Sequence, residues 1–174
     1  MHRAAAVAAL ILRVTIVGSP DDPRVADVRE AVAFWNHELR AIGADVRFGP
    51  VVLSDAPVPE EQAALRHVGG DVVIALTRGE FASYTLPARG GAPAFIALRR
   101  GDVPPLSQPN VARNVIAHEL GHVLGLEHNT DATKLMCGRP AACRPDAFVS
   151  SRPHFFALTA AEKQHLKERG RPAR

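Results

Sequence analysis

The chain has 174 residues, a length that fits one domain with a sizeable hydrophobic core. Hydrophobic residues make up 47% of it and the net charge is +3, which is ordinary for a globular protein. The arginines are scattered without interleaved aromatic residues, which argues against nucleic acid as a partner, and no apolar run is long enough for stable membrane insertion.

The N-terminal residues 1–11 carry a basic start followed by an apolar run. This pattern is typical of a short signal sequence, but no clear small-x-small cleavage site follows it. The run continues into 13–17, which is typical of a strand, so a signal remnant and an extension of the first strand both remain open. Export is favoured, in part by the two cysteines, and the expected location is secreted or periplasmic.

A long amphipathic helix is predicted next. Asp22-Pro23 places proline at the first helical position, and Gly43 ends the pattern. Between them, apolar residues recur at spacings of three and four: Val25, Val28, Val32, Trp35, Leu39 and Ile42. One face of this helix is therefore expected to pack on a sheet.

Three short strands are predicted after this helix. They are 46–53, broken at Gly49-Pro50, then 71–76, and then 92–98. Gly90-Gly91 precedes the third strand.

The most informative segment is 118–128, which holds three histidines, a glutamate and a glycine at fixed offsets. A helix that begins near Asn110 would place His118 and His122 one turn apart on one side, where both imidazoles can reach a single metal ion. Glu119 would lie on the adjoining flank, where it can address a water molecule at the metal without binding the metal itself.

The third histidine, His128, requires the helix to stop. Six more helical residues would carry His128 roughly 9 Å beyond His122, whereas a Zn–N bond is about 2.0–2.1 Å long. The chain must therefore fold back, and Gly125 is the residue that can take a positive φ at a helix C-terminus. The spacing predicts that His118, His122 and His128 bind one zinc ion.

These residues give the chain a resemblance to a known family. The pattern H-E-x-x-H-x-x-G-x-x-H is similar to that of the metzincin zinc metallopeptidases. Met136 follows His128 by eight residues, the distance at which the matrixin branch of the metzincins has its methionine turn. The intervening 129–131 resembles the Ser-Thr-Asp of matrixins, and 158–162 resembles the start of their C-terminal helix.

The resemblance implies a zincin-like α+β fold, with a twisted mixed sheet and two long helices. A small loop-rich C-terminal subdomain would follow, with a terminal helix opened by the capping box Thr159-x-x-Glu162. A single catalytic domain would span 12–170, divided into an upper subdomain of about 12–127 and a lower one of about 128–170. A peptide substrate would lie antiparallel to an edge strand, for which 92–98 is the best candidate.

The implied activity is that of a zinc endopeptidase, which hydrolyses peptide bonds with metal-activated water. Zn²⁺ would be held by His118, His122 and His128, and Glu119 would be the general base that later passes its proton to the leaving amine. Met136 would form a hydrophobic floor. The expected partners are peptide or protein substrates, and a monomer is expected.

The chain also departs from the family pattern. No cysteine lies upstream of the motif, so a bacterial-type member without a cysteine-switch propeptide is expected. The stretch 77–93 has no histidine, unlike the loop that holds structural zinc and calcium in vertebrate matrixins. Gly138 stands where some metzincins have a tyrosine ligand, two residues after the methionine.

Cys137 and Cys143 are the only two cysteines, and they come directly after the methionine. A disulfide between them would fit an exported protein and would stiffen one wall of the substrate pocket. Two free thiols are the alternative, and the disulfide is favoured.

Two functions remain as alternatives to a peptidase. An inactive zinc-binding module would keep the histidines without any need of Glu119. A zinc hydrolase of a non-peptide substrate would share the chemistry of amide attack. The presence of Glu119 favours an active enzyme over the inactive module.

Overall fold

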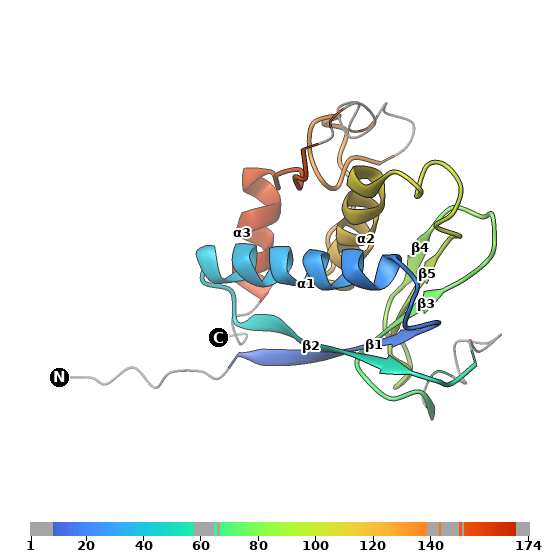
Figure 1. Cartoon of the computed structure of the whole chain (residues 1–174). Coiled ribbons are helices and arrows are strands. Elements are labelled where there is room, and N and C mark those ends of the chain that lie inside the picture. Colours follow the sequence, from blue (N-terminus) through green and yellow to red (C-terminus); the bar gives the residue numbers. More distant parts are fainter. Residues whose placement is uncertain are drawn as a thin grey trace.

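Figure 1 shows the computed structural model of the chain, which describes residues 9–57, 65, 67–138, 143, 150 and 152–169. The elements in chain order are β1 (Leu10–Val17), α1 (Arg24–Ala41), β2 (Val46–Ser54), β3 (Val72–Leu76), β4 (Tyr84–Leu86), β5 (Ala94–Leu98), α2 (Pro109–Val123) and α3 (Ala160–Arg169). None of the helices in this described part is long and apolar enough to cross a membrane. Residues 1–8, on which most of the predicted signal or strand extension falls, lie outside the described residues.

The strands form one mixed sheet in the order β2-β1-β3-β5-β4. All neighbouring pairs are parallel except β4 and β5, which are antiparallel. The helices α1 and α2 lie over one face of the sheet, and α3 stands beside them on the side away from β4 (Figure 1). The predicted α+β fold is therefore confirmed.

The edge strand near the motif helix is β4, which corrects the prediction made for 92–98. Strand β5 occupies most of that segment, but it lies inside the sheet between β3 and β4. Strand β4 falls between the predicted strands 71–76 and 92–98, where no strand was predicted from the sequence. With three residues, β4 is too short to show a periodic pattern.

A tight turn at Gly90-Gly91 joins β4 to β5. Both glycines have positive φ, +56° and +78°, as a two-residue type I′ turn requires. Arg89 N–H donates to Ala92 O at 3.3 Å, and Ala92 N–H donates to Arg89 O at 2.9 Å. A glycine pair between two extended segments is a hairpin signal, so the sequence did contain one sign of β4.

Strand β2 is continuous, so the break predicted at Gly49-Pro50 is wrong. The register of β1 against β2 shifts between Leu12 and Val14, where one residue of β1 opposes this dipeptide. The extra residue is accommodated as a bulge. Pro50 is tolerated there because β2 is the other edge of the sheet, where proline need not donate to a neighbouring strand.

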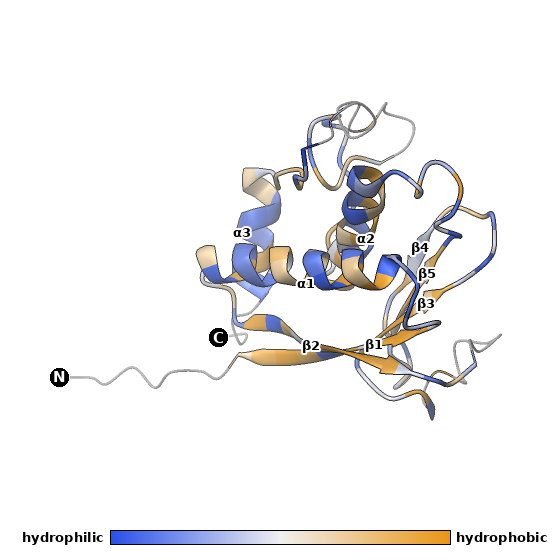
Figure 2. Cartoon of the chain, viewed as in Figure 1, coloured by the Kyte–Doolittle hydropathy of each residue, from blue (hydrophilic) through white to orange (hydrophobic). Residues whose placement is uncertain are grey.

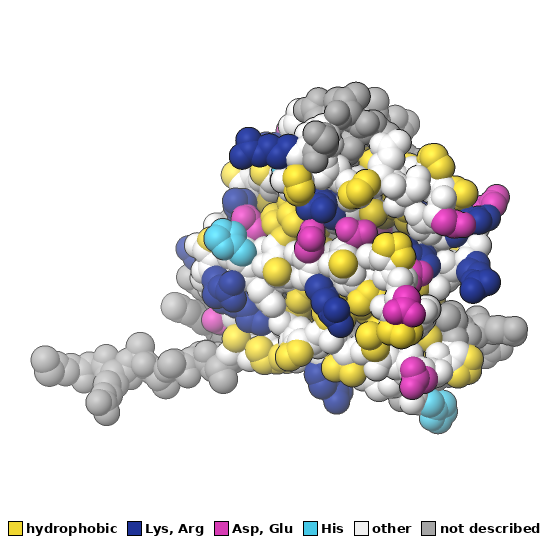
Figure 3. Space-filling view, in the orientation of Figure 1, with side chains coloured by type: hydrophobic (Ala, Val, Ile, Leu, Met, Phe, Trp, Pro, Cys, Tyr) yellow, Lys and Arg dark blue, Asp and Glu magenta, His cyan; other side chains and the backbone are white. Residues whose placement is uncertain are grey.

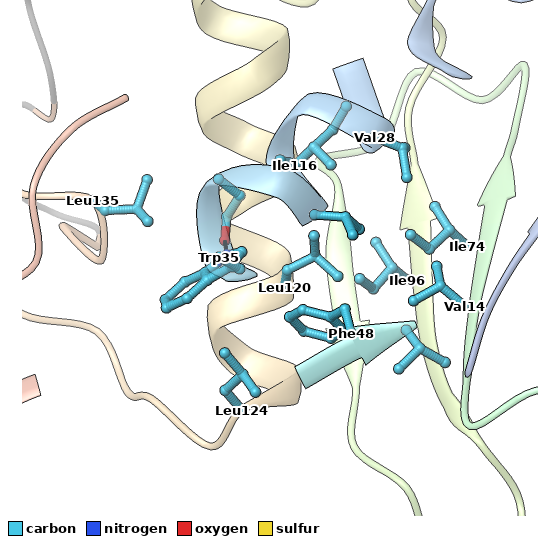
Figure 4. Packing of buried hydrophobic residues seen from close by; sticks show 14 of the residues in the cluster. Val14, Val28, Trp35, Phe48, Ile74, Ile96, Ile116, Leu120, Leu124 and Leu135 are labelled. Carbon is cyan, nitrogen blue, oxygen red and sulfur yellow. Dashed lines mark hydrogen bonds between the residues drawn. The ribbon is translucent and has the colours of Figure 1, made fainter. Parts of the chain in front are cut away.

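The main core lies between the sheet and the two long helices. Val14, Ile74 and Ile96 point from the strands toward α1 and α2 (Figure 4). Trp35 of α1 is fully buried, and its Nε1–H donates to Ala117 O of α2 at 2.8 Å. This bond fixes α1 against the helix that carries the histidine motif.

Helix α1 has the predicted amphipathic pattern, but it begins at Arg24, so Pro23 is its N-cap and not its first helical residue. Gly43 follows the helix with φ +69°. The apolar residues predicted to face the sheet are buried, with Ile42 partly so: Val25, Val28, Val32, Trp35 and Leu39. Figure 2 shows the result, with apolar strands beneath a helix that alternates between apolar and polar residues along its length.

Charged side chains are mixed over the surface. On the face seen in Figure 3, Lys and Arg side chains are interspersed with Asp and Glu side chains and do not gather into one basic patch. The charged side chain of Arg24 does not lie on the surface. It is buried at the start of α1, where it pairs with Asp22 at 2.6 Å and donates to Thr77 O and Leu98 O at 3.0 and 3.1 Å.

Candidate active site

Helix α2 presents the first two histidines of the motif. Pro109 begins the helix and Val123 ends it. His118 and His122 are one turn apart, and their ring centroids lie 4.8 Å from each other. Glu119 follows His118 on the adjoining flank and is buried, with 6% of its surface exposed.

The helix stops where the sequence predicts. Gly125 has φ +82°, and its N–H donates to His122 O at 2.9 Å. Leu126 N–H donates to Gly121 O at 3.0 Å. These two bonds form the Schellman pattern, which ends a helix at a left-handed residue. The chain then turns back and returns His128 to the helix.

The three imidazoles converge on one point. The Nε2 atoms of His118, His122 and His128 lie 3.1 Å apart in all three pairs. A tetrahedral zinc ion with Zn–N bonds of about 2.0–2.1 Å would separate its nitrogen ligands by about 3.3–3.4 Å, so the triangle fits such an ion with little movement. Among the described residues, no other group of three or more His, Cys, Asp or Glu side chains could hold a metal ion.

Backbone carbonyls orient two of the rings. Nδ1 of His118 lies 2.8 Å from Leu135 O, and Nδ1 of His122 lies 2.8 Å from Leu126 O. Because a carbonyl oxygen can only accept, each Nδ1 carries the proton and each Nε2 presents a lone pair to the centre of the triangle. Neutral imidazole nitrogens are common ligands of zinc in proteins.

Met136 packs beneath the motif helix and is fully buried. A Cβ on Gly121 would lie 2.5 Å from Met136 Sδ, so glycine in the helix allows this close approach. Asn129 N–H donates to Met136 O at 2.8 Å, which ties the methionine to the turn that carries His128. These contacts fit the hydrophobic floor expected of Met136.

The opposite wall of the site comes from β4. Thr85 Oγ1 lies 2.7 Å from Glu119 Oε2 and 3.0 Å from Glu119 O. Thr85 was not predicted from the sequence, because no motif in 77–93 marks a contact with the helix. A cavity of about 370 Å³ is lined by both walls: Ser83, Tyr84, Thr85, Pro87, Glu119, His122 and His128. A larger hollow of about 610 Å³ lies beside Gly90-Gly91, but it contains neither the histidines nor Glu119.

Comparison with protein families identifies the chain. The model of the matrixin family, peptidase family M10, matches residues 58–148, more than half of the chain. The chain belongs to the matrixin family. It is therefore a zinc endopeptidase of the metzincin type, as the motif predicts. No curated protein matches it.

Two solved structures share the fold of this matrixin. One is archaemetzincin from Methanopyrus kandleri, with a TM-score of 0.53 and 15% identity over 95% of this chain and 98% of that chain. The other is metalloproteinase-II from Bacteroides fragilis, with a TM-score of 0.55 and 18% identity over 94% of this chain and 55% of that chain. At these identities the likeness shows the fold alone.

The cysteines of the matrixin form the predicted disulfide. Cys137 and Cys143 are bonded, with their Cα atoms 5.6 Å apart, and no free cysteine occurs among the described residues. Residues 139–142, which the bond encloses, lie outside the described part of the chain, so their role as a pocket wall stays a prediction.

Gly138 occupies the position at which some metzincins carry a tyrosine ligand. A Cβ on Gly138 would lie 2.3 Å from His128 Cγ and 2.5 Å from His128 Cβ. These ring-proximal atoms cannot move without moving the imidazole. This matrixin therefore packs backbone against the third histidine.

Helix α3 contacts the site region at both of its ends. Thr159 N–H donates to Glu162 Oε2 at 2.6 Å and Glu162 N–H donates to Thr159 Oγ1 at 3.1 Å, which confirms the capping box. Glu162 Oε1 also accepts from Asn129 Nδ2 at 2.7 Å, in the turn after the motif. At the other end, Arg169 Nη1 donates to Leu124 O at 2.7 Å and so satisfies a carbonyl at the end of α2.

Proposed function

We propose that His118, His122 and His128 hold the zinc ion of this matrixin and that Glu119 is its general base. The observation that carries the proposal is the triangle of Nε2 atoms 3.1 Å apart, beside a cavity that Glu119 also lines. Bound by these three imidazoles, a zinc ion would supply Lewis-acid chemistry, which would lower the pKa of a water molecule and polarise the scissile carbonyl.

Glu119 moves the protons of the reaction. Its carboxylate takes one proton from the attacking water and later delivers it to the leaving amine, so one side chain serves both steps. The side chain is buried, and low solvent exposure strengthens its electrostatic interactions within the site. Glu119 and His122 line the cavity from helix α2, and His128 lines it from the turn that follows the helix.

The substrate peptide pairs with the open edge of β4 in this proposal. The hydrogen bonds of β5 support it. Ala94 N–H donates to Asp71 O, and Leu98 O accepts from Thr77 N–H, so both β5 residues bond on the β3 side. Alternate residues of β5 therefore face β3, and the residues between them face β4.

The same alternation identifies the outward groups of β4. Tyr84 and Leu86 pair with the β5 residues that face β4. The backbone N–H and C=O of Thr85, which lies between them, therefore point away from β5. Beside this edge, Phe81, Tyr84 and Leu86 are exposed apolar side chains that suit contact with a peptide.

We also propose that residues 12–170 form one catalytic domain that acts as a monomer on peptide or protein substrates outside the cytosol. The disulfide supports an oxidising compartment, because such bonds are rare in reducing cytosol. A secreted or periplasmic location follows from this argument.

Zinc analysis and casein hydrolysis with and without a chelator test the function. We expect one zinc ion per chain, hydrolysis that the chelator abolishes, and recovery when zinc is added back. A stoichiometric zinc protein that cleaves no protein substrate would instead favour the inactive module. Hydrolysis of esters without hydrolysis of peptides would favour the non-peptide hydrolase.

A further inference from the structure

The contact between Thr85 and Glu119 joins the strand side of the cavity to the reacting carboxylate. Thr85 Oγ1 lies 2.7 Å from Glu119 Oε2 and 3.0 Å from the backbone oxygen of the same residue. We infer that Thr85 is a positioning residue, whose hydroxyl holds the Glu119 carboxylate in the orientation in which it accepts the proton. This inference rests on the proposed role of Glu119 as the general base.

The chemistry of the contact gives it a direction. An ionised carboxylate can only accept a hydrogen bond, so the Thr85 hydroxyl donates. Hydrogen bonds to a charged acceptor are about twice as strong as those between neutral groups. The second acceptor belongs to the same residue, so the hydroxyl stays over Glu119 whichever of the two oxygens receives its hydrogen.

Such a hydrogen bond restrains the last side-chain torsion of Glu119. The last side-chain torsion of glutamate is broad and roughly two-fold, so the aliphatic stem does not fix where the two oxygens point. Holding Oε2 on Thr85 fixes the plane of the Glu119 carboxylate and therefore the direction of Oε1. Proton transfer needs heavy atoms about 2.6–3.2 Å apart, so this direction affects the rate of the chemical step.

Thr85 has a second connection to the reaction through its backbone. Its N–H and C=O point to the open edge of β4, where the substrate peptide is proposed to pair, while its side chain reaches Glu119 on α2. One residue therefore contacts both the proposed peptide and the proposed base. A peptide that fixes the Thr85 backbone also fixes the hydroxyl above Glu119, so substrate pairing and alignment of the base are coupled.

The hydroxyl can be removed with little effect on the fold. Thr85 is half-buried on a three-residue strand at the edge of the sheet. Valine has the same branched shape and a high strand propensity. Thr85→Val therefore removes the hydrogen bond alone, and Thr85→Ser keeps the hydroxyl without the methyl group. Thr15→Val makes the same chemical change on β1, away from the cavity, and is the matched control.

Steady-state kinetics of the zinc-loaded proteins tests the inference. We expect kcat of Thr85→Val to fall about 10- to 100-fold, as for loss of a hydrogen bond to a charged group, with KM changed less than about twofold. Thr85→Ser should recover kcat to within about threefold of the wild type. Thr15→Val should match the wild type in both parameters, and all four proteins should bind one zinc ion.

Crystal structures of the metal-free proteins give a readout that does not depend on turnover. The Glu119 carboxylate should take one orientation in the wild type and in Thr85→Ser. In Thr85→Val it should take a different orientation or more than one. If Thr85→Val does not fold, Thr85→Ala replaces it with the same expectations.

Three results would overturn the inference. They are a Thr85→Val enzyme with wild-type kcat, a Thr85→Ser enzyme as slow as Thr85→Val, and loss of zinc from Thr85→Val, which would make Thr85 a support of the metal site. Failure of the proposed function looks different, because the wild type itself would then bind zinc and cleave no peptide.

Discussion

Two walls face each other across the cavity, and they are built in different ways. The helix wall, α2 with the turn after it, takes three histidines and Glu119 from residues 118–128. The strand wall, residues 83–87 around β4, belongs to a hairpin whose one local mark is Gly90-Gly91. In the proposed function the helix wall supplies side chains that react, whereas the strand wall supplies backbone groups that align the substrate.

This difference teaches where each kind of substitution acts. In the proposed function, each named side chain of the helix wall acts on a single ion or a single water molecule, so its loss is not compensated by a neighbour. Apart from the Thr85 hydroxyl, the strand wall works through its backbone and its position, so most changes there should alter substrate binding more than chemistry. We therefore expect helix-wall variants to lose turnover or zinc, and strand-wall variants other than those of Thr85, whose hydroxyl contacts Glu119, to raise KM.

Glu119→Ala should have the largest effect. Without a general base, kcat should fall by about 10²–10⁴-fold or more, because the same carboxylate also protonates the leaving amine. Zinc content and thermal stability should stay near those of the wild type, because the three histidines are unchanged. Casein or peptide hydrolysis combined with metal analysis measures both.

Glu127→Ala is the matched control for Glu119→Ala. Glu127 lies in the same motif segment but is exposed and does not line the cavity. It should keep wild-type turnover. If Glu119→Ala cleaves peptides as fast as Glu127→Ala, the assignment of the helix wall to chemistry is wrong.

Gly138→Ala should weaken zinc binding. Its Cβ would lie 2.3 Å from His128 Cγ, and overpacking of this kind typically costs about 1–3 kcal/mol. If the His128 ring moves to relieve the clash, zinc affinity should fall by about 10- to 100-fold. Competition with a chromophoric chelator measures the affinity. Gly49→Ala, whose nearest Cβ contact is 3.2 Å from an Ile11 methyl carbon, is the control and should bind zinc normally.

Gly91→Ala should act on the strand wall. Gly91 has φ +78° in the turn of the hairpin, and nothing lies within 4 Å of its Cβ position, so the substitution adds backbone strain of about 1–2 kcal/mol and no clash. Loosening of β4 should raise KM several-fold with little change in kcat.

Gly43→Ala distinguishes a local effect from general destabilisation. Gly43 also has positive φ, +69°, and open space around its Cβ position, but it lies after α1. Its stability cost should match that of Gly91→Ala while KM stays unchanged. Equal rises of KM in both variants would remove the distinction between the walls.

The helix wall could be predicted from the sequence because its geometry depends on residues that lie close together in the chain. The spacing of His118 and His122 follows from the helix repeat, and Gly125 marks where the helix must stop. The disulfide and the capping box of α3 were likewise readable over short distances. Each of these features depends on residues fewer than about a dozen positions apart.

The strand wall was not predicted because strand pairing is a long-range property. Whether 92–98 is an edge depends on β4, a three-residue strand with no periodicity, and the contact of Thr85 with Glu119 joins residues 34 positions apart. The break predicted at Gly49-Pro50 is wrong for the same reason, because the edge position of β2 permits proline in a continuous strand.

Asp27 lies on α1, outside both walls, and should give the smallest effect. Burial raises its pKa to about 6, with the positive charge of Arg113 opposing the shift and Glu30 adding to it. The folded protein therefore binds this proton more tightly than the unfolded chain, in which the pKa is near 3.8. The stabilisation is complete below about pH 4 and is lost as the pH rises through about 6.

Asp27→Asn should remove this pH dependence without touching either wall. Asparagine stays neutral, so at about pH 8 the free energy of unfolding should rise by about 1 kcal/mol, a value reduced for solvent screening because Asp27 is half-exposed. Near pH 4 the gain should vanish, because Asp27 is then protonated in the folded wild type. Urea unfolding at the two pH values measures the difference. The pH profile of kcat/KM should match the wild type, since Asp27 does not line the cavity, and a shifted profile would mean that α1 influences the helix wall directly.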